Sequence, residues 1–283
     1  MFKILKKQEL ATGIKLFEIS APEIAAKGQP GQFVIVRMDE LSERIPLTIA
    51  DFDRNRDTLT LIFQEVGRST IDLGTMNEGD VILDIVGPLG KASEIEKFGK
   101  IICIGGGVGI APIYPITRAL KQAGNTVYSI IGARSREHLI LEKEMQAISD
   151  YFFVVSDDGS TGEKGFVTDV LQRLMDEVKD VALVVAIGPL PMMKAASEMT
   201  RPYGIKTIVS LNPIMVDGTG MCGACRVAVG GNTMFACVDG PEFDGHQVDW
   251  SIAELRSRMF VNEEIIAMNK CCSGGEGQCQ KQK

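Results

Sequence analysis

The chain has 283 residues and a net charge of −7, with 45% hydrophobic and 24% charged residues. This length favours two domains, and the composition is that of a globular protein, which argues against a disordered tail or a repeat rod. No apolar run approaches ~18 residues, so no membrane-spanning helix is expected. The acidic balance, without a long basic run, argues against a nucleic-acid partner. The first residues lack the apolar core of a secretory signal, so a cytoplasmic location is expected.

The first 98 residues predict a small antiparallel barrel. Runs rich in β-branched and aromatic residues alternate there with turn-forming segments, which is the pattern of several short strands. A short helix is expected to begin at Thr70–Leu73. The expected strands are Ile14–Ile19, Gln32–Met38, Leu59–Phe63 and Val81–Val86, and the turns are Pro30-Gly31, Asp53–Asp57 and Glu78–Asp80.

From Lys100 the pattern changes to apolar runs that alternate with helical segments. This alternation predicts a parallel sheet covered on both faces by helices. The expected strands are Lys100–Ile104, Thr126–Gly132, Phe152–Ser156, Val181–Ile187 and Lys206–Leu211, and the helices are Ala111–Ala123, Arg136–Ser149, Gly165–Val178 and Met192–Thr200. The fold class is thus β plus α/β, with three expected units at 1–98, 99–211 and 212–283. The last unit includes a helix over Ser251–Met259 and a polar, glycine-rich tail from Lys270.

A glycine-rich turn, Gly105-Gly106-Gly107-Val108-Gly109, stands between the first strand of the α/β unit and its first helix. Glycines let the backbone approach an anion closely, and the amides of a helix N-terminus bind one. Pro112 suits the first helical turn. The alternative interpretation is a tight turn without a ligand. The position of the turn in a five-strand α/β unit favours phosphate binding.

The seven cysteines are clustered rather than spread along the chain. Cys103 stands alone, one group is Cys222, Cys225 and Cys237, and another is Cys271, Cys272 and Cys279. A secreted domain held by disulfides would use an even number with a wider spread, so the clusters indicate a metal site in a reducing compartment. The segment after Cys225 predicts a hairpin around Gly230-Gly231-Asn232, which carries Cys237 back towards Cys222 and Cys225.

Zinc and a [2Fe–2S] cluster are the two candidate metals, and each needs a fourth ligand. For zinc the nearby histidine is His246. For iron, plant-type [2Fe–2S] proteins use Cys-x4-Cys-x2-Cys and a distant Cys. Asp217 occupies the first position of this pattern, followed by Cys222, Cys225 and Cys237. A carboxylate can ligate iron, so the pattern favours the cluster; Asp217 can alternatively be an Asx-turn residue.

Four segments in a fixed order resemble the nucleotide-binding loops of the ferredoxin–NADP reductase superfamily. They are the loop Gly105–Pro112, Gly132-Ala133-Arg134, Ser156–Ser160 with Gly165–Thr168, and Gly188–Met193. The resemblance implies that NAD(P) pyrophosphate binds to the first loop, adenosine near the second and third, and nicotinamide at the fourth. The implied residues are Gly106, Gly107, Val108, Gly109, Pro112, Gly132, Ala133, Arg134, Asp157, Asp158, Gly188, Pro189 and Met192. Many members have a Cys before the last Gly-Pro, where this chain has Ile187.

In that superfamily the N-terminal barrel binds FAD, and Arg44-Ile45-Pro46-Leu47-Thr48 is the matching segment here. The usual pattern is Arg-x-aromatic-Ser/Thr; here Leu47 replaces the aromatic residue and the Arg lies one residue further upstream. The resemblance implies that Thr48 bonds the flavin N5 edge and that a helix start binds the pyrophosphate. The implied FAD residues are Arg44, Pro46, Leu47, Thr48, Ile62, Phe63, Gln64, Gly67, Ser69 and Thr70. Arg44 and Arg68 can also be read as solvated surface charges.

The order of a barrel, a nucleotide domain and a [2Fe–2S] lobe narrows the resemblance. It is similar to electron-transfer subunits of heterodimeric dihydroorotate dehydrogenases, and more so to the small subunit of NADH-dependent reduced ferredoxin:NADP oxidoreductase. This implies electron transfer between NAD(H), FAD, a [2Fe–2S] cluster and a larger flavo-iron–sulfur partner, with electron bifurcation. No side chain is expected to be catalytic, including His138 and His246. The rival functions are dihydroorotate oxidation and a nucleotide-binding regulator with a zinc lobe.

The charges expected at the adenosine end favour NAD(H) over NADP(H). Asp157 and Asp158 follow the third strand of the α/β unit, where carboxylates accept from ribose hydroxyls and repel a 2′-phosphate. Arg134 and Arg136 would have the opposite effect.

Overall fold

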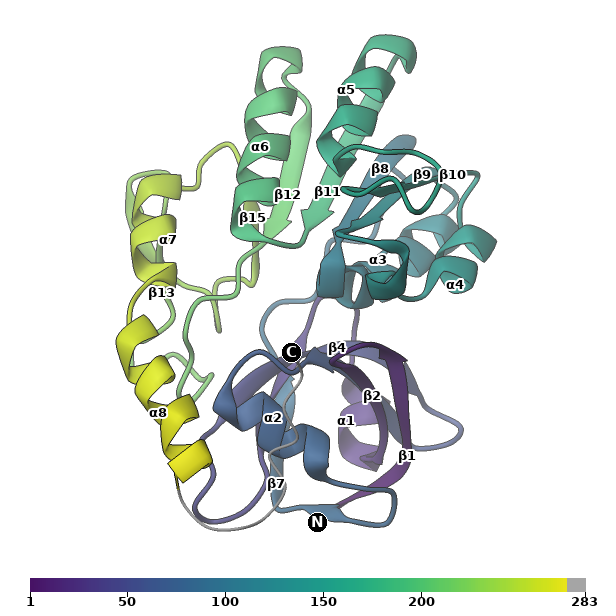
Figure 1. Cartoon of the computed structure of the whole chain (residues 1–283). Helices are drawn as coiled ribbons and strands as arrows, with labels where there is room; N and C mark the ends of the chain where they lie inside the picture. Colours follow the sequence, from purple (N-terminus) through teal and green to yellow (C-terminus); the bar gives the residue numbers. More distant parts are fainter. Residues whose placement is uncertain (274–283) are drawn as a thin grey trace.

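The computed structural model describes residues 1–273. The predictions that concern residues 274–283, including Cys279, and those that concern the side chains of Cys271 and Cys272 lie outside what it describes. The chain forms an antiparallel barrel-like sheet, a mainly parallel sheet flanked by helices, and a third part that contains the clustered cysteines (Figure 1). This confirms the β plus α/β fold class. No helix within the described range is long and apolar enough to cross a membrane.

The N-terminal sheet has seven strands in the order β6-β1-β2-β5-β4-β3-β7, and every neighbouring pair is antiparallel. Its interior contains Phe17 and Phe63, whose rings meet edge to face at 5.1 Å. Strands β1 and β4 and helix α1 were not expected: β1 carries many charged, exposed side chains and β4 contains Pro46, which hides the alternating pattern. The elements are β1 (Phe2–Ala11), β2 (Ile14–Ser20), α1 (Pro22–Lys27), β3 (Phe33–Arg37), β4 (Ile45–Asp53), β5 (Thr58–Gln64), α2 (Arg68–Thr75), β6 (Val81–Ile82) and β7 (Asp84–Leu89).

The second sheet has the order β10-β9-β8-β11-β12-β15, and its first five strands are parallel. Alternate residues of the buried strands face opposite layers: Ile101 and Cys103 pack in the layer with α3 and α4, while Ile102 and Ile104 pack in the layer with α5 and α6. The elements are β8 (Lys100–Gly106), α3 (Ile110–Gln122), β9 (Thr126–Ala133), α4 (Glu142–Ala147), β10 (Tyr151–Ser156), α5 (Val167–Glu177), β11 (Val181–Ile187), α6 (Leu190–Thr200) and β12 (Lys206–Ser210).

The third part contributes a strand to this sheet. Its strand β15 (Glu242–Asp244) pairs antiparallel with β12, and β13 (Arg226–Val229) and β14 (Asn232–Phe235) form the expected hairpin. Helix α7 (Trp250–Ser257) packs against β13, and α8 (Val261–Ser273) contacts α2 (Figure 1). The expectation of a tail from Lys270 is corrected, because α8 continues to Ser273. The exposed polar face of α8 gave no clear helical signal.

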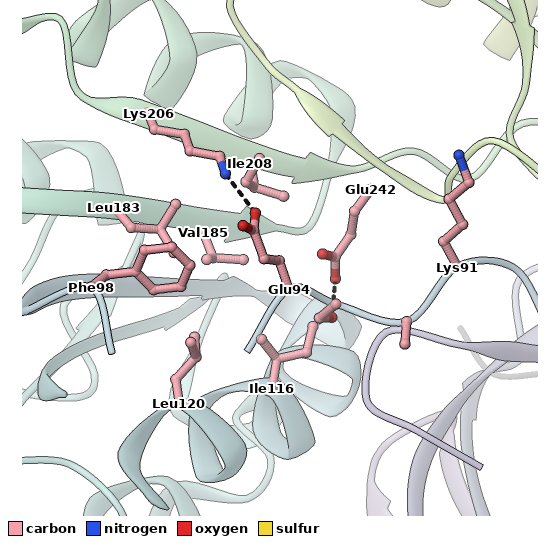
Figure 2. Close-up of a pocket in the computed structure, with 12 residues that line it drawn as sticks. Lys91, Glu94, Phe98, Ile116, Leu120, Leu183, Val185, Lys206, Ile208 and Glu242 are labelled. Atoms are coloured by element: carbon pink, nitrogen blue, oxygen red, sulfur yellow. Dashed lines mark hydrogen bonds and ion pairs between the residues drawn. The ribbon is translucent and has the colours of Figure 1, made fainter. Parts of the chain in front are cut away.

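The segment that links the two sheets meets all three parts of the molecule. The Ser93 hydroxyl donates to Glu242 Oε1 at 2.5 Å, and the Lys91 N–H donates to the Gly240 carbonyl at 2.7 Å. A cavity of ≈ 160 Å³ lies beside this segment, with Glu242 on one side and the apolar Phe98, Ile116 and Leu183 on the other (Figure 2). None of the residues expected to bind a cofactor lines it.

Candidate cofactor-binding sites

The loops expected to bind NAD gather at one edge of the second sheet. Strands β8, β9, β10 and β11 are parallel, so their carboxyl ends meet at the same edge. The register aligns Gly106 of β8 with Gly132 of β9, and Gly105 with Ile187 of β11. The glycine loop, the Gly132–Arg134 segment, the Asp157-Asp158 turn and the Gly188-Pro189 loop therefore follow neighbouring strands at one edge.

Close packing explains part of the glycine loop. A Cβ on Gly109 would lie 2.4 Å from the Ile187 carbonyl oxygen, and one on Gly106 would lie 2.4 Å from the Met192 sulfur. These two glycines let the first and fourth loops touch. Gly107 differs, because its φ is +56° and a Cβ there would meet nothing within 4 Å. Gly106 and Gly109 thus hold the loop against the fourth loop, while Gly107 leaves space on its other side. This space lies next to the start of α3, where backbone amides favour an anion.

The two loops expected to hold adenosine are bonded to each other. The Asp158 N–H donates to the Arg134 carbonyl at 3.2 Å, and the Arg136 N–H donates to Ser160 Oγ at 2.8 Å. Bonds from the hydroxyl and N–H of Ser160 hold the pKa of the Asp158 carboxyl below its ordinary value. Arg136 forms an ion pair with Glu142 at 3.5 Å. The ionised, exposed Asp158 carboxylate is therefore a fixed negative charge at this site.

The residues expected to bind FAD lie on β4, β5 and the start of α2. Pro46, Leu47 and Thr48 are half-buried on β4, while Arg44 is exposed in the preceding loop. Ser69 Oγ donates to Glu43 Oε2 at 3.0 Å, which joins this loop to α2. A Cβ on Gly67 would meet nothing within 4 Å, so the approach to the N-terminus of α2 is open. These features fit a pyrophosphate at the helix start.

Phe63 and Ile62 point to opposite sides of β5. Phe63 is 2% exposed and packs in the barrel interior, whereas Ile62 belongs to the apolar layer that includes Ile110 and Ile187 of the second sheet. Strand alternation places Gln64 on the same side as Ile62. The side chains of β5 that can border a bound ring are therefore Ile62 and Gln64, and Phe63 contributes backbone only.

Two of the three cysteines of the first group, Cys225 and Cys237, come together as the hairpin predicts. The Sγ atoms of Cys225 and Cys237 are 3.1 Å apart and buried, while Cys222 is exposed. Burial raises the pKa of the Cys237 thiol to about 12, and the neighbouring Cys225 and Asp217 add to this effect. The Cys237 thiol thus keeps its proton unless a cation is present. Metal binding would remove the thiol protons.

Asp217 is bonded to the backbone of the loop that carries Cys222. Its Oδ1 accepts from the Thr219 N–H at 2.8 Å and its Oδ2 from the Cys222 N–H at 3.0 Å. These backbone bonds, that from Thr219 first, hold the pKa of the Asp217 carboxyl below its ordinary value. The carboxylate is therefore ionised and adjacent to Cys222. The Asx-turn geometry is present. It holds the Asp217 carboxylate beside Cys222, the next residue of the expected ligand pattern.

Among the side chains of residues 1–269, no three Cys, His, Asp or Glu converge in a way that could hold one metal ion. A two-iron cluster needs two ligands on each iron instead, and the lobe offers two pairs, Cys225 with Cys237 and Asp217 with Cys222. Two thiolates on one tetrahedral metal, with bonds of about 2.3 Å, lie about 3.8 Å apart. The pair at 3.1 Å would have to open to about this spacing on binding iron. The fit to a [2Fe–2S] cluster therefore rests on the donor set, which is three cysteines and one ionised carboxylate.

The histidine needed by the zinc alternative is used elsewhere. His246 Nε2 is 3.0 Å from the hydroxyl of Thr200 on α6, and its backbone carbonyl accepts from Arg201 at 3.0 Å. His138 is likewise occupied, since its Nδ1 lies 2.8 Å from Ser135 Oγ. Neither histidine joins a metal-binding group in the part of the chain that the structure describes.

The loop of Asp217 packs directly on the barrel, a contact that the sequence did not reveal. Gly218 has φ +75°, and a Cβ there would lie 2.8 Å from Ile35 and 2.9 Å from Leu89. Ile35 of β3 pairs with Pro46 of β4, which belongs to the expected flavin segment. The expected cluster and flavin sites are thus joined through one strand. About 180 positions separate Ile35 from Gly218, and no local pattern reports such a contact.

Together these features define a ferredoxin reductase-like oxidoreductase with a nucleotide domain and an iron–sulfur lobe. Residues 103–198 match the family described as oxidoreductase NAD-binding domain, and residues 212–249 match the iron–sulfur cluster binding domain of dihydroorotate dehydrogenase B. A Thermotoga maritima protein described as a dihydroorotate dehydrogenase B (NAD(+)) electron transfer subunit homolog is 47% identical over 269 residues, covering 95% of this chain and 94% of that one. The electron transfer subunit from Desulforamulus reducens is 32% identical, covering 88% and 97%.

The chain therefore belongs to the family of dihydroorotate dehydrogenase B electron transfer subunits and their homologues. A solved structure of an NADH-dependent reduced ferredoxin–NADP oxidoreductase, described for flavin-based electron bifurcation, contains a chain of the same fold. It superposes with a TM-score of 0.91 at 46% identity, covering 96% of this chain and 98% of that chain. The family and fold support FAD, an iron–sulfur cluster and NAD(H) as cofactors. The chain is thus an electron-transfer subunit of an oxidoreductase.

Proposed function

We propose that this chain passes electrons between NAD(H) and a larger flavo-iron–sulfur partner in an electron-bifurcating, NADH-dependent reduced ferredoxin:NADP oxidoreductase of the cytoplasm. The observation that carries the proposal is the pair of sites joined through β3: the cluster loop packs on Ile35, and Ile35 pairs with Pro46 of the flavin segment. When bound, FAD would exchange a hydride with NAD(H) and single electrons with the cluster, which carries one electron at a time.

The residues of this chain bind and position these groups and supply no general acid or base. The open glycine loop and the start of α3 would hold the NAD pyrophosphate, and the start of α2 would hold that of FAD. The set Asp217, Cys222, Cys225 and Cys237 would hold the cluster. Cys222 is exposed and Met221 beside it is 88% exposed, so the cluster loop is open to a docked partner.

The visible spectrum and the partner test this proposal together. The purified complex should show flavin and iron–sulfur absorption, and a larger flavo-iron–sulfur subunit should co-purify. Reduction of NADP by NADH should require reduced ferredoxin. A colourless, zinc-containing chain would overturn the cofactor assignment.

Subunit docking has its own test. Met221→Asp should release the larger subunit in size-exclusion chromatography while this chain keeps its cofactors. Leu5→Asp is the matched control, since Leu5 is 45% exposed on β1 of the barrel. Equal retention of the subunit by both variants would place the docking surface elsewhere.

A second candidate is the electron-transfer subunit of an NAD-dependent dihydroorotate dehydrogenase. The 32% identity to the Desulforamulus reducens subunit favours it. In that case the complex would oxidise dihydroorotate with NAD and would need no ferredoxin. The two functions differ in the co-purifying subunit, so one assay with dihydroorotate and one with ferredoxin and NADP separate them.

A further inference from the structure

Two arginines from different elements hold the loop that carries Cys222 and Cys225. Arg256, in the last turn of α7, donates from Nη2 to the Ala224 carbonyl at 2.7 Å. Arg226, at the start of β13, donates from Nη1 to the Gly223 carbonyl at 3.1 Å. Residue 256 lies beyond the segment 212–249 that matches the cluster-binding family. The carbonyls of both residues between the two cysteines are therefore bonded to guanidinium groups.

One of these two peptide units faces the Cys222 sulfur. The Ala224 N–H donates to Cys222 Sγ at 3.5 Å, and this N–H shares its peptide unit with the Gly223 carbonyl that Arg226 holds. A cation bonded to the carbonyl end polarises the amide and strengthens the donor at its other end. Hydrogen bonds to the cluster sulfurs and the local charge set the potential of an iron–sulfur centre. Arg226 thus acts on a donor to the Cys222 sulfur, and Arg256 holds the next peptide unit of the same loop.

Neither positive charge is neutralised by a carboxylate. With the side chains of residues 1–269, neither Arg226 nor Arg256 forms a salt bridge. Arg256 Nε is buried and has no hydrogen-bond partner. Burial first, and then the charge of Arg226, lower the pKa of Arg256, while the nearby Cys225 raises it. A guanidinium stays protonated nonetheless, so two cations remain beside the loop.

A purely structural role does not account for this arrangement. A half-buried guanidinium with an unpaired N–H, placed near a second cation, costs free energy that an apolar side chain would avoid. The arrangement becomes favourable when the loop carries negative charge. A [2Fe–2S] core with three thiolates and one carboxylate has a net charge of about −2 when oxidised and about −3 when reduced, so cations stabilise the reduced form more.

We propose that Arg256, with Arg226 as its second arm, is a positioning residue of the [2Fe–2S] site that holds the Cys222–Cys225 loop and raises the reduction potential of the cluster. This inference rests on the proposed function, since it requires the cluster. Arg256 reaches the loop from α7, so this helix becomes part of the cluster site. The charge eases electron entry into the cluster from the flavin side.

Three variants of the full chain, in its complex, separate charge from hydrogen bonding. Arg256→Gln keeps an amide donor for the Ala224 carbonyl but removes the charge, and Arg256→Lys keeps the charge. Arg258→Gln is the matched control: it removes the same charge from the exposed residue just after the same helix. The measurements are iron and acid-labile sulfide per chain, and the midpoint potential from an EPR-monitored redox titration.

The midpoint potential should become more negative in Arg256→Gln, by clearly more than in Arg258→Gln, and Arg256→Lys should return it to near the wild-type value. Equal potentials in wild type, Arg256→Gln and Arg258→Gln would overturn the inference alone. If Arg256→Gln holds no cluster, Arg256→Lys decides: a loaded cluster at the wild-type potential supports the role of charge, and an empty site or a changed potential overturns it. A wild-type chain without a [2Fe–2S] EPR signal would overturn the proposed function as well.

Discussion

Cys225 and Cys237 are twelve positions apart, yet their Sγ atoms lie 3.1 Å from each other in the interior of the cysteine lobe. The hairpin of β13 and β14 closes this distance, since Arg226 pairs with Phe235 at its open end. A thiol is a weak hydrogen-bond donor and acceptor, so two adjacent buried thiols stabilise each other little. Burial raises the pKa of the Cys237 thiol to about 12. Both thiols therefore suit metal ligands. The next point is which residue completes the ligand set with Cys222, Cys225 and Cys237.

Asp217 is expected to supply that ligand. Asp217→Ala should lose iron to a chelator at least roughly tenfold faster than wild type, because removal of a supporting group alone weakens metal sites by about that factor. Asp217→Cys should keep a [2Fe–2S] cluster with a changed spectrum and potential, because a thiolate donates more electron density than a carboxylate. Both variants should retain FAD, which binds a separate domain. Iron content, EPR and flavin content are the measurements.

The control for this prediction is Asp239→Ala. Asp239 lies in the same lobe and also accepts a backbone bond, from the Phe235 N–H at 2.8 Å, but it falls outside the ligand spacing. Alanine at Cys222, Cys225 or Cys237 should match Asp217→Ala, whereas alanine at Cys271, Cys272 or Cys279 should not. An Asp217→Ala protein with unchanged iron, EPR signal and potential would leave Asp217 as a turn residue only.

The sequence predicted the strands, loops and hairpin that carry the candidate sites, because local patterns determine these elements. The parallel strands and their loops followed from hydrophobic runs and glycines, and the hairpin that returns Cys237 followed from Gly230-Gly231. The contact of Gly218 with Ile35 and the bond from Arg256 to Ala224 were not predicted. Both join residues far apart in the sequence, and a glycine or an arginine at such a position has no periodic signature.

Elements with mixed polarity were also missed. Strand β1 is largely exposed and α8 carries many exposed polar residues, so neither showed a clear apolar face. Strand β15 was hidden because it contains only three residues. Its pairing with β12 could be recognised only once the sheet order was known. Burial by tertiary contacts, rather than local propensity, decides these elements.

NADH should be the better electron donor, by at least roughly tenfold in diaphorase kcat/KM over NADPH, since carboxylates repel a 2′-phosphate. The ionised Asp158 is the repelling group, and Arg136 is held by Glu142 at 3.5 Å. Glu142→Gln would free Arg136 and should raise kcat/KM for NADPH by roughly two- to fivefold, the range of an exposed ion pair. Glu144→Gln, an exposed change on the same helix, should leave it unchanged. Comparable values for both nucleotides in wild type would refute the preference.

The contact between the cluster loop and the barrel gives a stability prediction. Gly218→Ala should destabilise the protein by about 1–2 kcal/mol from the left-handed backbone and by about 1–3 kcal/mol more from the clash with Ile35 and Leu89. Gly231→Ala is the control, because Gly231 has a similar φ of +77° but an added Cβ would meet nothing within 4 Å. Urea unfolding measures both. Equal losses of unfolding free energy in the two variants would mean that Gly218 makes no close contact with Ile35 and Leu89.

Glu242 should make stability depend on pH. Its carboxyl is buried at the meeting point of the three parts and accepts from Ser93, and burial raises its pKa from 4.5 to about 7. Lys91, Glu94 and Lys206 also line the cavity, and Lys206 is paired with Glu94 at 2.6 Å (Figure 2). The folded state thus binds a proton more tightly than the unfolded state. Its stability is highest below pH 4.5 for this group and falls as the pH rises towards 7, by up to about 3 kcal/mol.

Glu242→Gln removes this dependence and keeps an acceptor for the Ser93 hydroxyl. The variant should be more stable than wild type at pH 8 in urea unfolding, and the difference should shrink as the pH falls towards 5. Glu94→Gln is the matched control: it changes a carboxyl at the same cavity whose side chain is 56% exposed. That variant should keep the pH dependence of wild type. A Glu242→Gln protein that loses stability between pH 5 and pH 8 as steeply as wild type would show that the buried carboxyl does not cause the effect.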